Sequence, residues 1–196
     1  MILSNQEIES LVEEIYPTIF IDNCIPQSLL CGQIFHESSN NTLAFANDRN
    51  GGSYGLMQID KDVITELGFP IDTDLNDPKL NITVGFTFMK LLYNGEFHNE
   101  AINNLSNETM KLAMALVCYN CGYGNFNLLY DNHLQRNYID SWNNNMQNNI
   151  SLIENWYSCL AYPVAVITQA NINYGFAVDS YIRNSYLGEV PLFHLS

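Results

Sequence analysis

The chain has 196 residues, and 47% of them are hydrophobic, which is enough for one folded domain with a substantial core. Its formal net charge of -14 argues against nucleic acid as a partner, because phosphates would be repelled. The same charge argues against electrostatic recruitment to an anionic surface.

The N-terminal sequence MILSNQEIES lacks the basic and apolar regions of a secretory signal peptide. The sequence also lacks a run of about 18 apolar residues, so we expect no membrane span. Ser4 and Glu7 have the spacing of a capping box, which predicts a first helix. Its apolar stripe is expected to stop at Pro17.

A second helix is predicted to begin near Pro26 and to carry Glu37 at its end. Leu30, Ile34 and Glu37 follow the spacing of one helix face, so Glu37 extends the core-facing stripe. A half-buried carboxylate loses hydration, which raises its pKa and suits a general acid. The alternative is a helix-terminal glutamate that turns to solvent. His36 lies on a different face and is predicted to be a partly exposed structural residue.

Residues 40–55 form a loop rich in Asn and Gly. Such a loop either brings backbone N–H groups close to a ligand or is an ordinary surface loop. Asp60 follows the loop and precedes KDVITEL, so it fits the N-cap of a short helix. An N-cap carboxylate is engaged with backbone N–H groups and makes a poor base, which competes with a catalytic role for Asp60.

Asp77 and Pro78 predict the start of a further helix. Its buried face is expected to comprise Leu80, Val84, Phe88, Leu91 and Leu92. Gly85 is expected to let a neighbouring helix approach closely.

The next predicted helix is capped by Asn107 and carries an apolar stripe that Asn120 continues. Glu37 continues an apolar stripe in the same way. We therefore expect Asn120 to be buried and both helices to finish at one cleft.

Five cysteines, at positions 24, 31, 118, 121 and 159, leave one unpaired in any disulfide scheme. The C-x-x-C at 118–121 precedes Gly122 at a helix C-terminus, whereas a redox thiolate needs a helix N-terminus. Zinc would need a second ligand pair, and positions 24 and 31 are too far apart in sequence. We predict reduced structural thiols, with no metal and no other cofactor.

Beyond residue 130 the periodicity is helical. SLIENWYSCLAY and PVAVITQANINYGFAVDSYIRNSYLG are predicted as separate helices, the second broken at Gly175. The Tyr and Trp residues of this part are expected in the core, although such residues also stack on sugars. The predicted fold is all-α, or mainly α with a minimal β element, in one domain over 1–196.

Three sequence blocks occur in a characteristic order: HES at 36–38, GGSYGLMQID at 51–60 and CYNCGYGN at 118–125. Together they resemble the lysozyme-like soluble lytic transglycosylases and the goose-type lysozymes. That family has a helix ending in Glu-Ser, a G-x-x-G-L-M-Q turn and a helix ending in A-Y-N-A-G. The resemblance covers residues 20–130 and implies a lysozyme-like fold, with 131–196 as a helical C-terminal part of the same domain. Cys118 and Cys121 depart from the family pattern, since they replace alanines.

The resemblance implies a role for each matching residue. Glu37 matches the catalytic acid, whereas Asp48 and Asp60 match two aspartates that assist a water in the goose-type enzymes. The match of Asp48 requires a small gap. The implied substrate-binding residues are Ser38, Tyr54, Gly55, Leu56, Met57, Gln58, Tyr119 and Asn120.

The resemblance also implies a glycosidase that cleaves the β-1,4 bond between N-acetylmuramic acid and N-acetylglucosamine in peptidoglycan. Glu37 alone would serve a lytic transglycosylase, as acid and then as base, and the product would carry an anhydro ring. Asp48 or Asp60 would instead hold a water in a hydrolase. Chitin cleavage and a non-catalytic wall-binding or particle protein are the alternatives.

We expect a monomer whose partner is the glycan strand of peptidoglycan. Without a signal peptide, it would reach the wall by phage-type release or within a virion or a secretion machine.

Overall fold

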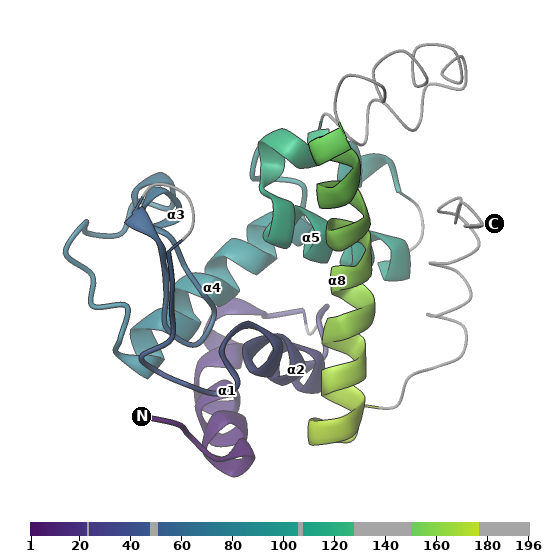
Figure 1. The fold of residues 1–196 in the computed structure, drawn as a ribbon. Helices are drawn as coiled ribbons and strands as arrows, with labels where there is room; N and C mark the ends of the chain where they lie inside the picture. Colours follow the sequence, from purple (N-terminus) through teal and green to yellow (C-terminus); the bar gives the residue numbers. More distant parts are fainter. Residues whose placement is uncertain (23, 48–50, 106–107, 128–149, 177–196) are drawn as a thin grey trace, which may run out of the picture. The chain divides into compact units, whose positions relative to one another are not determined.

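The computed structural model describes residues 1–22, 24–47, 51–105, 108–127 and 150–176 (Figure 1). The chain divides into two compact units, Met1–Lys90 with Ala165–Val178 and Leu91–Val164 with Asp179–Ser196. The secondary-structure elements of the described parts are all helices apart from one short hairpin, which confirms the mainly α fold class. The single domain over 1–196 stays a prediction.

Helices α1 (Asn5–Ile19) and α2 (Gln27–Ser38) lie side by side in the first unit (Figure 1). The capping box is confirmed: the Glu7 carboxylate accepts the backbone N–H of Ser4 at 2.7 Å, and the Ser4 hydroxyl accepts the N–H of Glu7. The expected stop at Pro17 is wrong, because α1 continues to Ile19. Proline lacks only one N–H and has a helical φ, so the last turn of a helix accommodates it.

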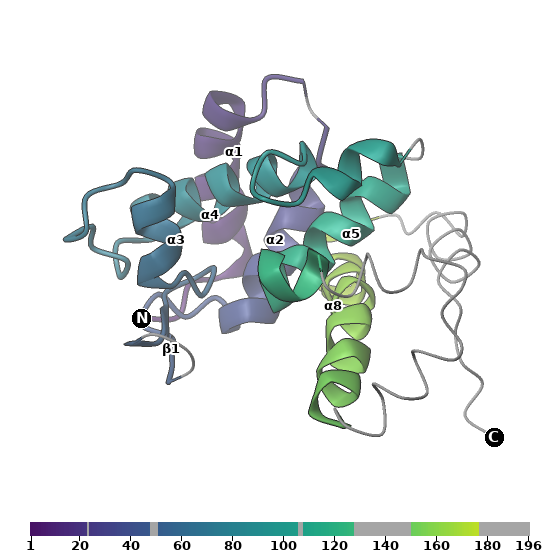
Figure 2. The same ribbon diagram turned by 90° about the horizontal axis from the view of Figure 1, so that it is seen from above.

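A two-stranded antiparallel hairpin follows α2. Strand β1 (Phe45–Ala46) pairs with β2 (Ser53–Tyr54), with Phe45 opposite Tyr54 and Ala46 opposite Ser53. The hairpin leads into a compact turn and then into α3 (Lys61–Glu66); Figure 2 shows α3 above β1.

Helix α4 (Pro78–Tyr93) begins where the sequence predicted. The Asp77 carboxylate accepts the N–H of Leu80 at 2.9 Å, as an N-terminal cap does. The expected burial of Leu80 is wrong, since it is 43% exposed. It shares the outward face of α4 with the half-buried Thr83 and Thr87, while Val84 and Phe88 are buried as expected.

Helix α8 (Ile150–Tyr174) is continuous through Pro163, so the prediction of two separate helices is wrong. Tyr162, Pro163 and Val166 are all buried, and this packing outweighs the helix-breaking tendency of proline. The helix ends before Gly175, which has φ +63° as the predicted break requires.

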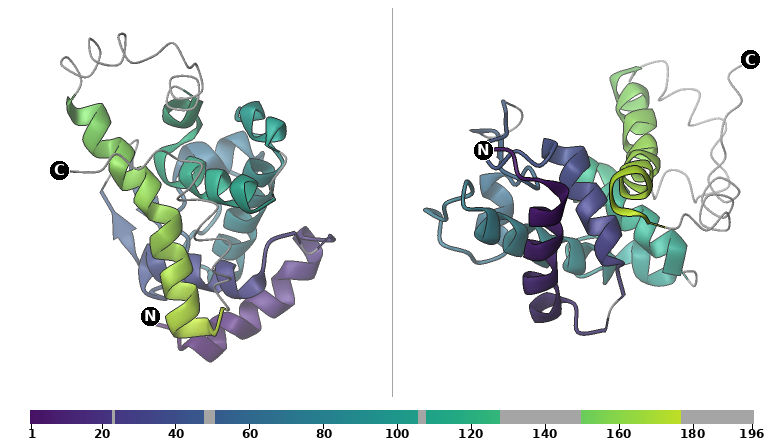
Figure 3. Two further views of the ribbon diagram at one scale, coloured as in Figure 1. Left: turned by 90° about the vertical axis from the view of Figure 1, so that its right-hand side faces the viewer. Right: turned by 90° about the horizontal axis from the view of Figure 1, so that it is seen from below.

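The C-terminal half of α8 packs against α2 in the first unit (Figure 3). A Cβ atom built on Gly32 would lie 2.5 Å from the Cβ of Ala170 and 2.6 Å from its backbone. The glycine therefore allows the two helix backbones to approach closely, and it fixes α2 against α8.

The second unit contains the 3₁₀ helix η2 (Glu100–Asn104), helix α5 (Glu108–Cys121) and the N-terminal half of α8. Residues 113–118 of α5 are all buried. The predicted cap Asn107 lies outside the described residues. None of the described helices combines the length and the apolar content that a bilayer-spanning helix needs.

Candidate active site

Glu37 is the penultimate residue of α2, and its side chain is half-buried. This is the position that the helical spacing predicts for a general acid. His36 is exposed, and its structural role stays a prediction. The Ser38 hydroxyl donates to the carbonyl of Ile34 at 3.0 Å, so its proton is used inside the helix and its oxygen retains acceptor capacity.

The chain leaves α2 through two successive residues in the left-handed region, Ser39 with φ 51° and Asn40 with φ 61°. Asn40 is buried and anchors this exit. Its side-chain amide donates to Asn5 Oδ1 at 3.0 Å and accepts from the Tyr174 hydroxyl at 3.2 Å, while its carbonyl accepts the N–H of Leu3 at 2.9 Å. These bonds tie the end that carries Glu37 to α1, to α8 and to the N-terminal segment.

The turn from Tyr54 to Ile59 closes on itself. Tyr54 and Ile59 exchange backbone hydrogen bonds of 2.9 and 3.0 Å, and the Gly55 N–H donates to the carbonyl of Ala44 at 2.9 Å. Gln58 has φ 47°, and its side-chain amide donates to the carbonyl of Gly55 at 3.0 Å.

The predicted substrate-binding residues of this turn differ in accessibility. Tyr54 and Gln58 are half-exposed, whereas Gly55, Leu56 and Met57 are buried. Leu56 and Met57 have 0% exposure and therefore pack the turn onto the core. Tyr54 and Gln58 are the accessible members of the turn, and contact of any of the five residues with a substrate stays a prediction.

Asp60 caps α3: its carboxylate accepts the N–H of Val63 at 2.8 Å. The predicted N-cap role of Asp60 is thus confirmed, and a carboxylate that is engaged in this way is a poor base. Asp48 lies outside the described residues, so its role stays a prediction.

Tyr119 and Asn120 are in the last turn of α5, in the second unit. Tyr119 is half-buried. The expected burial of Asn120 is wrong, because this residue is exposed. Burial along α5 extends over 113–118 rather than along a single stripe, so the spacing of Asn120 from those residues did not determine its environment. A shared cleft with Glu37 stays a prediction.

Sequence analysis missed Asn40 and Asn81, two buried asparagines that hold the site region. Asn81 on α4 accepts the N–H of Met57 at 2.8 Å and donates to the carbonyls of Tyr54 and Leu75 at 2.9 and 3.0 Å. A signal for Asn81 was available, since it lies four positions before Gly85 and therefore on the same face of the helix. Gly85 itself receives Met57 of the turn and not the neighbouring helix that we expected.

Cys24, Cys31, Cys118 and Cys121 are free thiols, in agreement with the prediction for these four. Burial raises the pKa of Cys31 to about 12, with repulsion from Glu9 adding to the effect, and burial alone raises the pKa of Cys118. Thiols that stay protonated are poor nucleophiles and poor metal ligands. Within the described residues, no three His, Cys, Asp or Glu side chains could hold a metal ion together.

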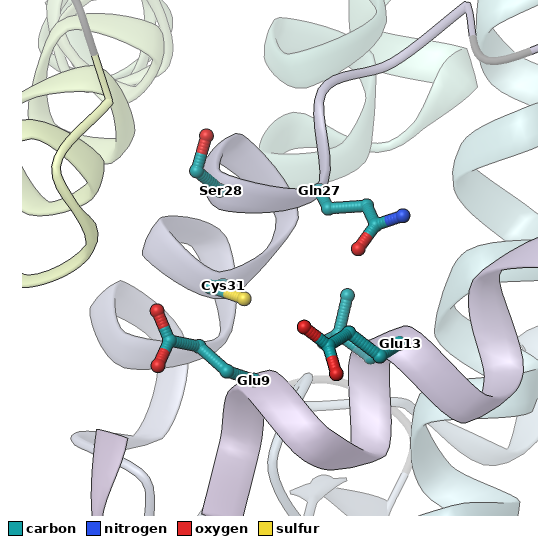
Figure 4. A pocket seen from close by; sticks show the side chains of 6 residues that line it. Glu9, Glu13, Gln27, Ser28 and Cys31 are labelled. Carbon is teal, nitrogen blue, oxygen red and sulfur yellow. The ribbon is translucent and has the colours of Figure 1, made fainter. Parts of the chain in front are cut away.

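A hollow of about 320 Å³ lies between α1 and α2 (Figure 4). Its lining residues are Glu9, Val12, Glu13, Gln27, Ser28 and Cys31. Figure 4 shows the Cys31 sulfur directed towards α1, between the carboxylates of Glu9 and Glu13. None of the predicted site residues lines this hollow, so it is separate from the candidate active site.

Comparison with known proteins identifies the family. Residues 22–153 match the model of the transglycosylase SLT domain. The crystal structure of the 70 kDa soluble lytic transglycosylase from Escherichia coli is similar to this chain, at 19% sequence identity and a TM-score of 0.53. The match covers 85% of this chain and 24% of that one, so the chain spans about a quarter of that enzyme's length. Comparison with curated proteins finds no match. The chain therefore belongs to the transglycosylase SLT domain family and has the mainly α, lysozyme-like fold of that family.

Proposed function

We propose that this protein is a peptidoglycan lytic transglycosylase that cleaves the β-1,4 bond between N-acetylmuramic acid and N-acetylglucosamine. The observation that carries the proposal is the half-buried position of Glu37 at the end of α2, in a chain of the transglycosylase SLT domain family. Partial burial disfavours the charged form of a carboxylate, and a protonated carboxyl group is what the departing sugar oxygen requires.

In the proposed reaction, Glu37 gives its proton to the bridging oxygen and the bond from that oxygen to C1 of the muramic sugar breaks. The N-acetylglucosamine end leaves with a hydroxyl group, and positive charge develops at C1 and the ring oxygen. The Glu37 carboxylate then takes the proton of the 6-hydroxyl of the same sugar, and O6 bonds to C1. The net reaction consumes no water and yields a 1,6-anhydro product.

Anhydro-ring formation needs one carboxyl group, whereas hydrolysis by an inverting route needs a second carboxylate that holds a water. The Asp60 carboxylate already accepts the N–H of Val63, which supports the route that does not use it. Hydrolysis assisted by Asp48 is the competing outcome of the same site.

The test compares the purified protein with Glu37→Gln on purified peptidoglycan. The glutamine side chain preserves size and hydrogen bonding but cannot donate a proton as an acid. We expect the rate of release of soluble fragments to fall by about 10²–10⁴-fold, with the thermal unfolding midpoint unchanged. Release at the wild-type rate by Glu37→Gln would refute the role of Glu37, and digestion of chitin in preference to peptidoglycan would reassign the substrate.

A further inference from the structure

We propose that Asn81 is a positioning residue for the glycan: its side-chain amide holds the Tyr54–Ile59 turn in the one conformation that presents Tyr54 and Gln58 to the substrate. The inference rests on the proposed function for the identity of the ligand, and it adds a residue outside the three sequence blocks.

The three bonds of Asn81 reach two separate segments, the Tyr54–Ile59 turn and the connection before α4. Its oxygen accepts the N–H of Met57, 24 residues away, and its nitrogen donates to the carbonyl of Tyr54, 27 residues away. The second proton of the amide goes to the carbonyl of Leu75, in the connection before α4. Asn81 is 0% exposed, so in the folded chain these three backbone groups are satisfied by the protein and not by bulk solvent.

Close packing accompanies the hydrogen bonds. A Cβ atom on Gly55 would lie 2.2 Å from the Asn81 nitrogen, and one on Gly85 would lie 2.3 Å from the Met57 sulfur. Asn81 and Gly85 lie one helical turn apart on the same face of α4. The Tyr54–Ile59 turn therefore contacts α4 at both of these residues. The turn is therefore held by α4 from outside, in addition to its own backbone bonds.

The turn needs such support because its backbone is strained. Gln58 has φ 47°, in the left-handed region that side chains with a Cβ disfavour, whereas Gly55 adopts its φ of 75° without strain. Gln58 is bonded to the carbonyl of Gly55 through both its backbone and its side chain, at 3.3 and 3.0 Å. Loss of the Asn81 side chain frees the N–H of Met57 and removes one of the two bonds to the carbonyl of Tyr54, which still accepts the N–H of Ile59. We expect the positions of the Tyr54 and Gln58 side chains to change as a result.

A buried asparagine can also be a purely structural residue, and the chain offers a matched control. Asn99 in the second unit is likewise 0% exposed. Its side chain donates to the carbonyl of Leu92 at 2.8 Å and accepts the N–H of Phe97 at 3.1 Å. A variant of Asn99 therefore loses similar bonds without touching the Tyr54–Ile59 turn.

The experiment uses the full chain with Glu37→Gln, so that a soluble glycan tetrasaccharide of peptidoglycan is bound and not consumed. Asn81→Ala, Asn81→Asp, Asn99→Ala and Asn99→Asp are each added to this background. Asn81→Asp preserves the acceptor for Met57 and loses both donated bonds, which gives a second variant if Asn81→Ala does not fold. Thermal unfolding identifies a temperature at which every tested protein is folded, and titration calorimetry there gives the dissociation constant.

We expect the Asn81 variants to raise the dissociation constant about tenfold and the Asn99 variants to leave it unchanged. Hydrogen exchange supplies an independent readout: the backbone amides of residues 55–58 should exchange faster in the Asn81 variants alone. Equal dissociation constants for Asn81 and Asn99 variants, with equal exchange at 55–58, would overturn the positioning role.

The two proposals fail separately. If Glu37→Gln digests peptidoglycan as fast as the wild-type protein, the proposed function fails whatever the Asn81 variants do. If Glu37→Gln is inactive and binds the tetrasaccharide equally well with and without Asn81→Asp, only the positioning inference fails.

Discussion

Each of the two compact units contains a fully buried asparagine, and the two side chains have different roles. Asn81 in the first unit and Asn99 in the second are both fully buried and both satisfy backbone groups through the side-chain amide. Two partners of Asn81 lie 24 and 27 residues away, whereas both partners of Asn99 lie within 7 residues. Asn99 stabilises the local segment in which it lies. Asn81 joins segments that only the tertiary fold brings together.

Glycines show the same contrast. Gly32 on α2 packs directly against Ala170, which is 138 residues later in the chain, whereas a Cβ atom on Gly124 in the second unit would meet nothing within 4 Å. The comparison indicates that the region around Glu37 depends on long-range contacts. Substitution of Gly32 should therefore be costly, whereas substitution of Gly124 should be tolerated.

The largest effect is expected from Gly32→Ala compared with Gly124→Ala. The new methyl group at position 32 overlaps the backbone of Ala170, so we expect the free energy of unfolding to fall by about 1–3 kcal/mol or more. Gly124→Ala has open space and should raise the free energy of unfolding by about 0.4–1 kcal/mol. Urea denaturation of the two variants measures both changes, and equal effects would remove the contrast between the units.

A smaller effect is expected from Asp60→Ala. This variant tests whether the Asp60 carboxylate contributes to stability or to the reaction. Loss of the bond to the Val63 N–H removes an N-cap, which costs about 1 kcal/mol of stability. We expect the rate of peptidoglycan digestion to be unchanged when it is measured well below the unfolding midpoint. A large fall in that rate without a matching loss of stability would instead make Asp60 a catalytic base.

The smallest effect at neutral pH is expected from the buried thiol in each unit, because this effect appears only in alkaline solution. The pKa of Cys31 is raised from 9.0 to about 12, and the pKa of Cys118 is also raised. The folded state therefore binds protons that the unfolded chain releases, so stability is complete below pH 9 and falls as the pH rises from 9 towards 12.

Each thiol contributes roughly 1 kcal/mol per pH unit in that window, and Cys31→Ala should make the fall less steep. Burial raises the pKa of both thiols, and repulsion from Glu9 and Glu13 raises the pKa of Cys31 further. Salt screens this repulsion, so added salt should lower only the pKa of Cys31. Unfolding curves at several alkaline pH values and two salt concentrations measure both effects, and a slope unchanged by Cys31→Ala would contradict the assignment.

Local signals in the sequence predicted three helix boundaries correctly, although the expected stop at Pro17 was wrong. The Ser4–Glu7 box, the Asp77–Pro78 start and the break at Gly175 all involve partners within a few residues. Such features depend on the backbone near them, so the sequence contains the information directly.

Predictions that depended on distant neighbours were less successful. Leu80 and Asn120 fit apolar helical spacing, but both are exposed, because the surroundings of a helix decide which of its faces is buried. Pro163 was expected to separate two helices, although packing keeps α8 continuous there. Asn40 and Asn81 were missed for the same reason, since their partners are known only once the chain has folded.

The mass of the products released from purified peptidoglycan tests the central claim most directly. A transglycosylase in which Glu37 acts as acid and then as base should release muropeptides that are lighter, by one water molecule, than the hydrolysis products. Digestion in isotopically labelled water should add no label to the muramic end, because no water is consumed. Products of full hydrolytic mass that carry the label would contradict the account and would require a second carboxylate to hold a water.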